Sequence, residues 1–313
     1  MRAPLRAAGD PPASLSVPPG ASVAAIGQTL QALGYVRYPL VFKALVASLG
    51  AGASLKAGDY TLEGPLSLTQ IVELLERGEA VRRDLTFPEG EHLEEMAALA
   101  AEAGLARDEF LAAARDPAPI RDLDPEAADL EGYLFPDTYD VPPGRVSAAA
   151  LVGRMVARFR ALMTPELPRV AQSGRTLRQV VTLASLVELE TARADERARI
   201  AAVFLNRLKK GMPLQTDPTV IFALRRAGRW DGNIRKKDLE IDSPYNTYRR
   251  AGLPPGPIAS PGRAALLAVL DPAPVADLFF VSRNDGSHEF NETLAAHERA
   301  VDRYQRRRPR AGS

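Results

Sequence analysis

The chain has 313 residues, of which 46% are hydrophobic and 25% charged, a composition typical of a globular protein with one large or two smaller domains. Its formal net charge of +1 provides no overall field for nucleic acid, and the absence of cysteine excludes disulfides, thiolate nucleophiles and cysteine metal sites. The three histidines lack the paired spacing of a zinc hydrolase, so we expect neither a metal nor a cofactor.

Residues 15–86 predict a small module in which short strands alternate with short helices. Ser67 and Gln70 have the spacing of a capping box, and Gly78 ends the helix that they begin. Residues 1–14 are rich in proline and alanine and predict a disordered lead-in. The expected strands are 15–17, 60–62 and 80–87, and the other expected helices are 22–33 and 39–49.

Residues 87–305 predict a larger domain in which helices and short strands are mixed. Between 213 and 260 turn formers and polar side chains predominate, and long loops in a compact domain are usually functional. The basic residues 306–313 predict a solvated tail. The sequence therefore predicts an α+β fold in two parts. The expected helices of the second part are 91–103, 107–115, 148–163, 177–191, 196–209, 264–270 and 293–304, and its expected strands are 278–281 and 287–291.

The helix expected at 177–191 carries two carboxylates. At helical spacing Glu188 shares a face with Val181 and Ala184, whereas Glu190 points elsewhere. A carboxyl on an apolar face is costly to ionise, so its pKa should rise, as a general acid near neutral pH requires. Glu188 is therefore the candidate acid. The alternative is a structural glutamate paired with one of the many arginines.

Three other segments hold side chains that suit a carbohydrate. Amide, hydroxyl and carboxylate groups at 215–217 can bind sugar hydroxyls, and the tyrosines of segment 244–248 can pack on sugar C–H faces. Asp217 followed by Pro218 can instead be a helix cap, and segment 244–248 an ordinary buried loop. Glu131, in the aromatic segment 130–139, is a candidate second carboxylate. These residues leave two interpretations open, a glycan-cleaving enzyme and a non-catalytic glycan-binding or scaffold protein of the envelope.

The chain resembles the endolytic murein transglycosylases of the YceG-like family, whose motifs it carries in family order between about residues 87 and 305. Segment 15–86 resembles the LysM-like module that precedes the catalytic domain in this family. The matching motifs are Leu130–Tyr133, Ala184–Thr191, Val203–Leu208, Gly211–Val220, Pro244–Tyr248, Gly252–Ile258 and His288–Phe290.

The resemblance implies a lyase that cuts the β-1,4 bond between N-acetylmuramic acid and N-acetylglucosamine inside peptidoglycan strands, an activity that would terminate the elongation of nascent strands. Glu188 would protonate the leaving oxygen and then, as carboxylate, take the proton of the sugar's own C6 hydroxyl, leaving a 1,6-anhydro end. An intramolecular nucleophile makes the second carboxylate of ordinary glycosidases unnecessary. The substrate-binding residues would be Glu131, Ser185, Gln215, Thr216, Asp217, Tyr245, Asn246, Thr247 and Tyr248. The alternatives are a muramidase that uses water and a non-catalytic scaffold.

Partners and location follow from the resemblance alone. It implies peptidoglycan glycan strands as substrate and peptidoglycan synthases of the elongation or division machinery as partners. Family members usually begin with one membrane-spanning helix, but here no apolar run approaches the roughly 20 residues of a membrane span. Residues 1–14 also lack the hydrophobic core of a signal peptide. The expected location is the extracytoplasmic face of the cell membrane.

Overall fold

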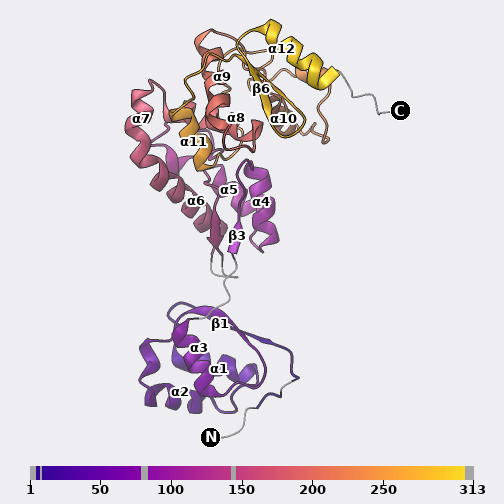
Figure 1. Cartoon of the computed structure of the whole chain (residues 1–313). Helices are drawn as coiled ribbons and strands as arrows, with labels where there is room; N and C mark the ends of the chain where they lie inside the picture. Colours follow the sequence, from indigo (N-terminus) through magenta and orange to yellow (C-terminus); the bar gives the residue numbers. More distant parts are fainter. Residues whose placement is uncertain (1–4, 8, 79–83, 142–145, 307–313) are drawn as a thin grey trace, which may run out of the picture. The chain divides into compact units, whose positions relative to one another are not determined.

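A computed structural model describes residues 5–7, 9–78, 84–141 and 146–306 (Figure 1). The chain divides into two compact units, each made of two stretches of sequence. The first unit comprises the chain up to Leu85 together with Tyr139–Ser147, and the second comprises Thr86–Thr138 together with the chain from Ala148. Among the described residues, helices are mixed with three two-stranded sheets, so the predicted α+β class is confirmed.

The first unit packs three helices on an antiparallel strand pair. In that pair Leu15 of β1 lies opposite Tyr60 of β2, and both side chains are fully buried. Phe42 and Leu30 are also fully buried in this cluster, so the unit has a hydrophobic core of its own. Its elements are β1 (Ala13–Val17), α1 (Val23–Ala32), α2 (Pro39–Ser48), a 3-10 turn (Ala51–Ala53), β2 (Gly58–Leu62) and α3 (Leu68–Arg77).

Local sequence signals account for most boundaries in this unit. Ser22 caps α1 by accepting a hydrogen bond from the Ala25 N–H, and Ser67 with Gln70 forms the predicted capping box of α3. The lead-in is shorter than predicted, because residues 13 and 14 already pair with β2. Of the strand expected at 80–87, residues 80–83 lie outside the described residues, and β3 covers Asp84–Thr86.

The second unit contains the remaining helices and the strand pair β5–β6, both of whose strands were predicted. The pair of β3 and β4 (Thr138–Asp140) lies where the chain passes from one unit to the other. The helices of the second unit are α4 (Leu93–Glu102), α5 (Arg107–Ala114), α6 (Ala148–Met163), α7 (Leu167–Gln172), α8 (Leu177–Glu190), α9 (Arg197–Lys209), α10 (Asp217–Arg226), α11 (Arg263–Leu270) and α12 (Leu294–Val301), and its strands are β5 (Phe279–Ser282) and β6 (His288–Asn291).

Helix α8 is the centre of the second unit, where it packs against α9, α10 and α11 (Figure 1). It begins at the capping box of Thr176 and Gln179 and ends where Thr191 becomes extended. Every residue from Val180 to Val187 is buried, so the helix is covered on all sides and not along one stripe. Both carboxylates at its C-terminal end therefore enter a packed interior.

Two helical predictions differ from the structure. Helix α7 was not predicted, because its six residues are too few for a periodic pattern. The last helix ends at Val301 and continues as a π-helical turn to Arg306.

Within the described chain, no helix combines the length and apolar character needed to cross a membrane.

Candidate active site

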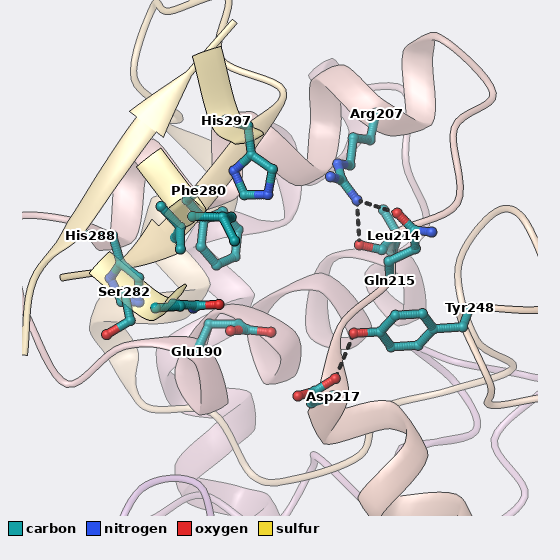
Figure 2. A pocket seen from close by; sticks show the side chains of 13 residues that line it. Glu190, Arg207, Leu214, Gln215, Asp217, Tyr248, Phe280, Ser282, His288 and His297 are labelled. Carbon is teal, nitrogen blue, oxygen red and sulfur yellow. Dashed lines mark hydrogen bonds between the residues drawn. The ribbon is translucent and has the colours of Figure 1, made fainter. Parts of the chain in front are cut away.

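A pocket of about 440 Å³ opens beside the C-terminal end of α8 (Figure 2). Its polar side chains come from segments that are far apart in the sequence, including the loop before α10 and the β5–β6 hairpin. The ionisable and amide-bearing residues that line it are Glu190, Arg207, Gln215, Asp217, Tyr248, His288, His297 and Gln305.

Glu190 brings a carboxyl group with an altered pKa into this pocket. Burial raises its pKa to about 6, and the nearby Asp217 carboxylate acts in the same direction. The Thr216 hydroxyl donates a hydrogen bond to its Oε1 and opposes the rise. A carboxyl group that titrates near pH 6 can both donate and accept a proton under neutral conditions.

Glu188 has different surroundings, although only one residue separates it from Glu190. Its Oε1 accepts a hydrogen bond from Arg197 Nη2 at 3.2 Å, and its Oε2 accepts one from the Gly262 N–H at 2.8 Å. Its side chain is 5% exposed, and it does not line the pocket. The same guanidinium lies 3.9 Å from the Glu89 carboxylate. These contacts match the alternative of a glutamate paired with an arginine.

Three of the predicted substrate-binding residues line the pocket. The carboxylate of Asp217 accepts a hydrogen bond from the Tyr248 hydroxyl at 2.6 Å, and Gln215 lies beside them (Figure 2). Burial and this bond to Asp217 raise the pKa of Tyr248, so its hydroxyl stays a donor. A helix does begin at Asp217–Pro218, as the helix-cap alternative predicted, but the cap position is Thr216 and Asp217 is the first residue of α10.

Thr216, Asn246 and Thr247 are buried and hold the loops that carry the pocket residues. The Thr216 N–H donates to Thr247 Oγ1 at 3.1 Å, and the Asn246 amide donates to the Leu239 and Ile241 carbonyls. These bonds fix the two predicted sugar-binding loops to each other. Two of the three side chains reach pocket residues: the Thr216 hydroxyl donates to Glu190, and Asn246 Oδ1 accepts from the Tyr248 N–H at 3.0 Å.

Gln215 has an unusual backbone conformation for a residue with a side chain. Its φ is +53°, in the left-handed region that costs a non-glycine residue about 1 kcal/mol. Its N–H donates to the Thr247 carbonyl at 3.2 Å, and Arg207 donates to its side-chain oxygen at 3.5 Å. Strain of this kind persists where surrounding contacts over-determine the conformation, and such positions cluster at functional sites.

The other three predicted substrate-binding residues do not line this pocket. Ser185 is fully buried; its hydroxyl donates to the Thr182 carbonyl and accepts from the Ile258 N–H. Glu131 is buried beneath α4, where its Oε2 accepts from the Leu93 N–H at 3.3 Å, and burial raises its pKa well above 4.5. Tyr245 packs on the Phe222 ring, 4.9 Å between centroids.

Arg207 and His288 belong to the pocket but were not predicted as site residues. Arg207 is buried and donates to the carbonyls of Leu214 and Leu278, which ties the loop before α10 to the β5 hairpin. His288 is held by Glu196, which accepts from the His288 N–H at 2.9 Å and contacts ring Nδ1 at 2.6 Å. Both residues stand in recognised motifs, but their neighbours in space are distant in sequence.

No group of three or more histidine, aspartate or glutamate side chains suited to a metal ion occurs in the described ranges. The residues that line the pocket offer proton transfer by Glu190, hydrogen bonding by Gln215, Tyr248 and Asp217, and the positive charge of Arg207.

The model of the YceG-like family matches residues 15–303. The chain belongs to the YceG-like family. The match covers nearly the whole of both units, so membership rests on the chain as a whole and not on the pocket motifs alone.

Curated relatives and a solved structure agree with this YceG-like assignment. The endolytic murein transglycosylase of Bacillus subtilis (strain 168) is 34% identical over 307 residues, which cover 93% of this chain and 84% of that protein. The endolytic murein transglycosylase of Streptococcus pneumoniae serotype 2 is 32% identical over 321 residues. The match covers 92% of this chain and 57% of the S. pneumoniae protein. A crystal structure of a YceG-like protein from Listeria monocytogenes is 31% identical, with a TM-score of 0.63 over 93% of this chain.

Proposed function

We propose that this YceG-like protein is a peptidoglycan lytic transglycosylase that cleaves glycan strands internally, and that Glu190 is its general acid and base. The observation that carries the assignment is the Glu190 carboxyl, which has a pKa of about 6 and lines a pocket with sugar-binding groups. The relatives named as endolytic murein transglycosylases support the reaction class.

The reaction needs one residue that first gives and then takes a proton. Protonated Glu190 donates its proton to the glycosidic oxygen as the bond from that oxygen to C1 of N-acetylmuramic acid breaks. The C6 hydroxyl of the same sugar then bonds to C1, and the Glu190 carboxylate takes the hydroxyl proton. The products are a strand with a 1,6-anhydro end and a strand with a free hydroxyl, and no water is consumed.

The other pocket residues hold the sugar in this mechanism. The paired Asp217 and Tyr248 present a carboxylate oxygen and a hydroxyl on one side of Glu190, and Gln215 presents an amide. Holding the ring so that the C6 hydroxyl faces C1 converts nucleophilic attack into a well-oriented intramolecular step. The strained backbone at Gln215 serves this positioning role.

The sequence-based candidate, Glu188, is the competing acid. Its carboxylate is already engaged by the Arg197 guanidinium and the Gly262 N–H, which leaves it poorly placed to offer a proton to a substrate. We therefore favour a structural role for Glu188, in which it fixes Arg197 and the loop before α11.

The digest of intact peptidoglycan tests the reaction class. Mass spectrometry of the products should detect 1,6-anhydro ends, which are lighter by one water than the ends produced by a muramidase. Hydrated ends alone would favour the hydrolase alternative. Absence of cleavage with every peptidoglycan substrate would favour the non-catalytic scaffold.

The first unit is proposed to be the LysM-like module predicted for segment 15–86, with peptidoglycan strands as its ligand. Its separate core and single strand pair support an autonomous binding module. The proposed location is the extracytoplasmic face of the cell membrane, with peptidoglycan synthases as partners. Co-purification from cross-linked cells tests the synthase proposal, and recovery without any synthase would contradict it.

A further inference from the structure

A second pocket, of about 360 Å³, lies at the other end of α10 from the Glu190 site. Asp217, in the first pocket, begins the helix, and Phe222, Arg225 and Arg226, in the second, lie in its last turns. Asp217 and Arg226 are nine residues apart, which corresponds to about 13 Å along the helix axis. The two pockets are therefore joined by one rigid element.

Two aromatic side chains line the second pocket. Trp230, the only tryptophan of the chain, and the buried Phe222 line it, and Gly228 leaves the space beside them open. The ring of Tyr245 packs on Phe222, with 4.9 Å between the ring centroids. The predicted sugar-binding tyrosine therefore contacts a lining residue of this pocket and does not line the Glu190 pocket. Flat aromatic faces of this kind pack well on the C–H face of a sugar ring.

Arg226 adds an unpaired positive charge at this pocket. Its guanidinium lies over the rings of Phe222 and Tyr245, at 5.7 and 5.6 Å from their centroids. Within the described part of the chain it has neither an ion pair nor a hydrogen bond. An arginine held on aromatic faces is pre-oriented, and its fork of N–H donors matches a carboxylate.

The acidic neighbours of the pocket do not neutralise Arg226. Arg225 contacts both His92 and the Glu95 carboxylate, and His92 Nδ1 lies 3.4 Å from Glu94. These charged groups pair with one another, although His92 Nδ1 and Arg225 Nε are buried without a hydrogen-bond partner among the described residues. Arg226 is thus the lining cation that has no partner, and charge complementarity calls for an anionic ligand.

We propose that the pocket formed by Phe222, Arg226 and Trp230 is a second substrate site that binds a carboxylate-bearing saccharide, with the sugar face on Trp230 and the carboxylate on Arg226. A muramyl residue that carries its peptide belongs to this chemical class. This inference rests on the proposed function, because the second site would bind the same glycan strand that Glu190 cleaves, at a point away from the cleaved bond.

The site can be tested in the full-length chain with Glu190→Gln, which prevents cleavage. Because Trp230 is the only tryptophan, the intrinsic tryptophan fluorescence reports on this pocket alone. The probes are the disaccharide N-acetylglucosaminyl-N-acetylmuramic acid with its peptide, and the neutral tetramer of N-acetylglucosamine. The anionic probe should change the fluorescence saturably and bind more tightly than the neutral probe by calorimetry.

Arg226→Ala should weaken binding of the anionic probe about tenfold or more, because a charged hydrogen-bond pair is lost. Arg229→Ala is the matched control, since Arg229 is a nearby exposed arginine that does not line the pocket. In the chain with Glu190 intact, Arg226→Ala should raise KM for long strands and leave kcat unchanged.

Two results would overturn the second site. One is an unchanged tryptophan signal on addition of the anionic probe; the other is equal affinity of the two arginine variants for it. Failure of the proposed function is separate, because it would appear as intact peptidoglycan after incubation with the unsubstituted chain. Cleavage without probe binding would refute the second site only.

Discussion

Two glutamates at the end of α8 differ in what holds their carboxylates. Glu190 is buried and lies near the Asp217 carboxylate, so its charged form is disfavoured, and the hydroxyl of Thr216 opposes this only in part. Glu188 receives a guanidinium and a backbone N–H, so both of its oxygens already have hydrogen-bond donors. A general acid needs the first environment, and a structural ion pair needs the second.

The pH dependence of cleavage should follow Glu190. Because the first step needs its protonated form, kcat/KM should fall as the pH rises through about 6. Thr216→Val removes the hydroxyl that stabilises the carboxylate, so the pKa of Glu190 should rise and the alkaline limb should move to higher pH. Thr216→Ser keeps the hydroxyl and is the control. Identical pH–rate profiles for the two variants would count against this role of Thr216.

Stability should respond in opposite directions to the two glutamine substitutions. The folded-state pKa of Glu190 is raised, so its contribution to stability is present below the ordinary value of 4.5 and is lost as the pH rises through about 6. Glu190→Gln should therefore be more stable than the unsubstituted chain at pH 8, but not at pH 4.5. Glu188→Gln should be destabilised at pH 8 by roughly 2 kcal/mol, because Arg197 loses its charged hydrogen-bond partner and keeps only the more distant Glu89 carboxylate, 3.9 Å away. Urea unfolding at the two pH values measures both, and a loss of stability in Glu190→Gln at pH 8 would refute the sign.

At the scale of elements, α8 explains why the helical pattern favours Glu188 whereas the pocket favours Glu190. The pattern assumes one buried face, and Glu188 lies on the face of Val181 and Ala184. Because α9, α10 and α11 cover the helix from several sides, every face is buried, and phase alone cannot tell which carboxyl meets a pocket. The local signals of the same helix, Thr176 and Gln179 at its start, were reliable because a cap involves only neighbouring residues.

Gly132, in the segment before β4, packs against Pro257 and against Val181 of α8. Its φ is +81°, and a Cβ there would lie 2.4 Å from Pro257 Cβ and 3.0 Å from Val181 Cγ1. Gly132→Ala should destabilise the fold by roughly 3 kcal/mol through backbone strain and overpacking. Gly174→Ala is the control, since Gly174 has a similar φ of +69° and open space around it, and should cost about 1 kcal/mol. Equal losses in thermal or urea unfolding would show that the close packing at Gly132 is unimportant.

At the scale of the whole molecule, the sequence predicted the α+β class and most helices, because caps and periodicity are local. It also identified Gln215, Asp217 and Tyr248, whose residue types suit a sugar wherever the loops lie. It missed Arg207 and His288, because their roles come from partners such as Leu278 and Glu196 that only the folded chain brings near. Asn246 and Thr247 are buried, a point that the sequence left open because sequence cannot separate a buried polar residue from an exposed one.

The central claim is that Glu190, and not Glu188, transfers the proton. The most direct test is cleavage of isolated glycan strands by the Glu190→Gln and Glu188→Gln variants, with mass spectrometry of the anhydro ends and circular dichroism to confirm folding. Glu190→Gln should lower the cleavage rate at least about 100-fold, the lower end of what general acid–base catalysis contributes, whereas folded Glu188→Gln should keep most of its activity. Near-normal cleavage by Glu190→Gln, together with loss of cleavage in a folded Glu188→Gln, would contradict the assignment.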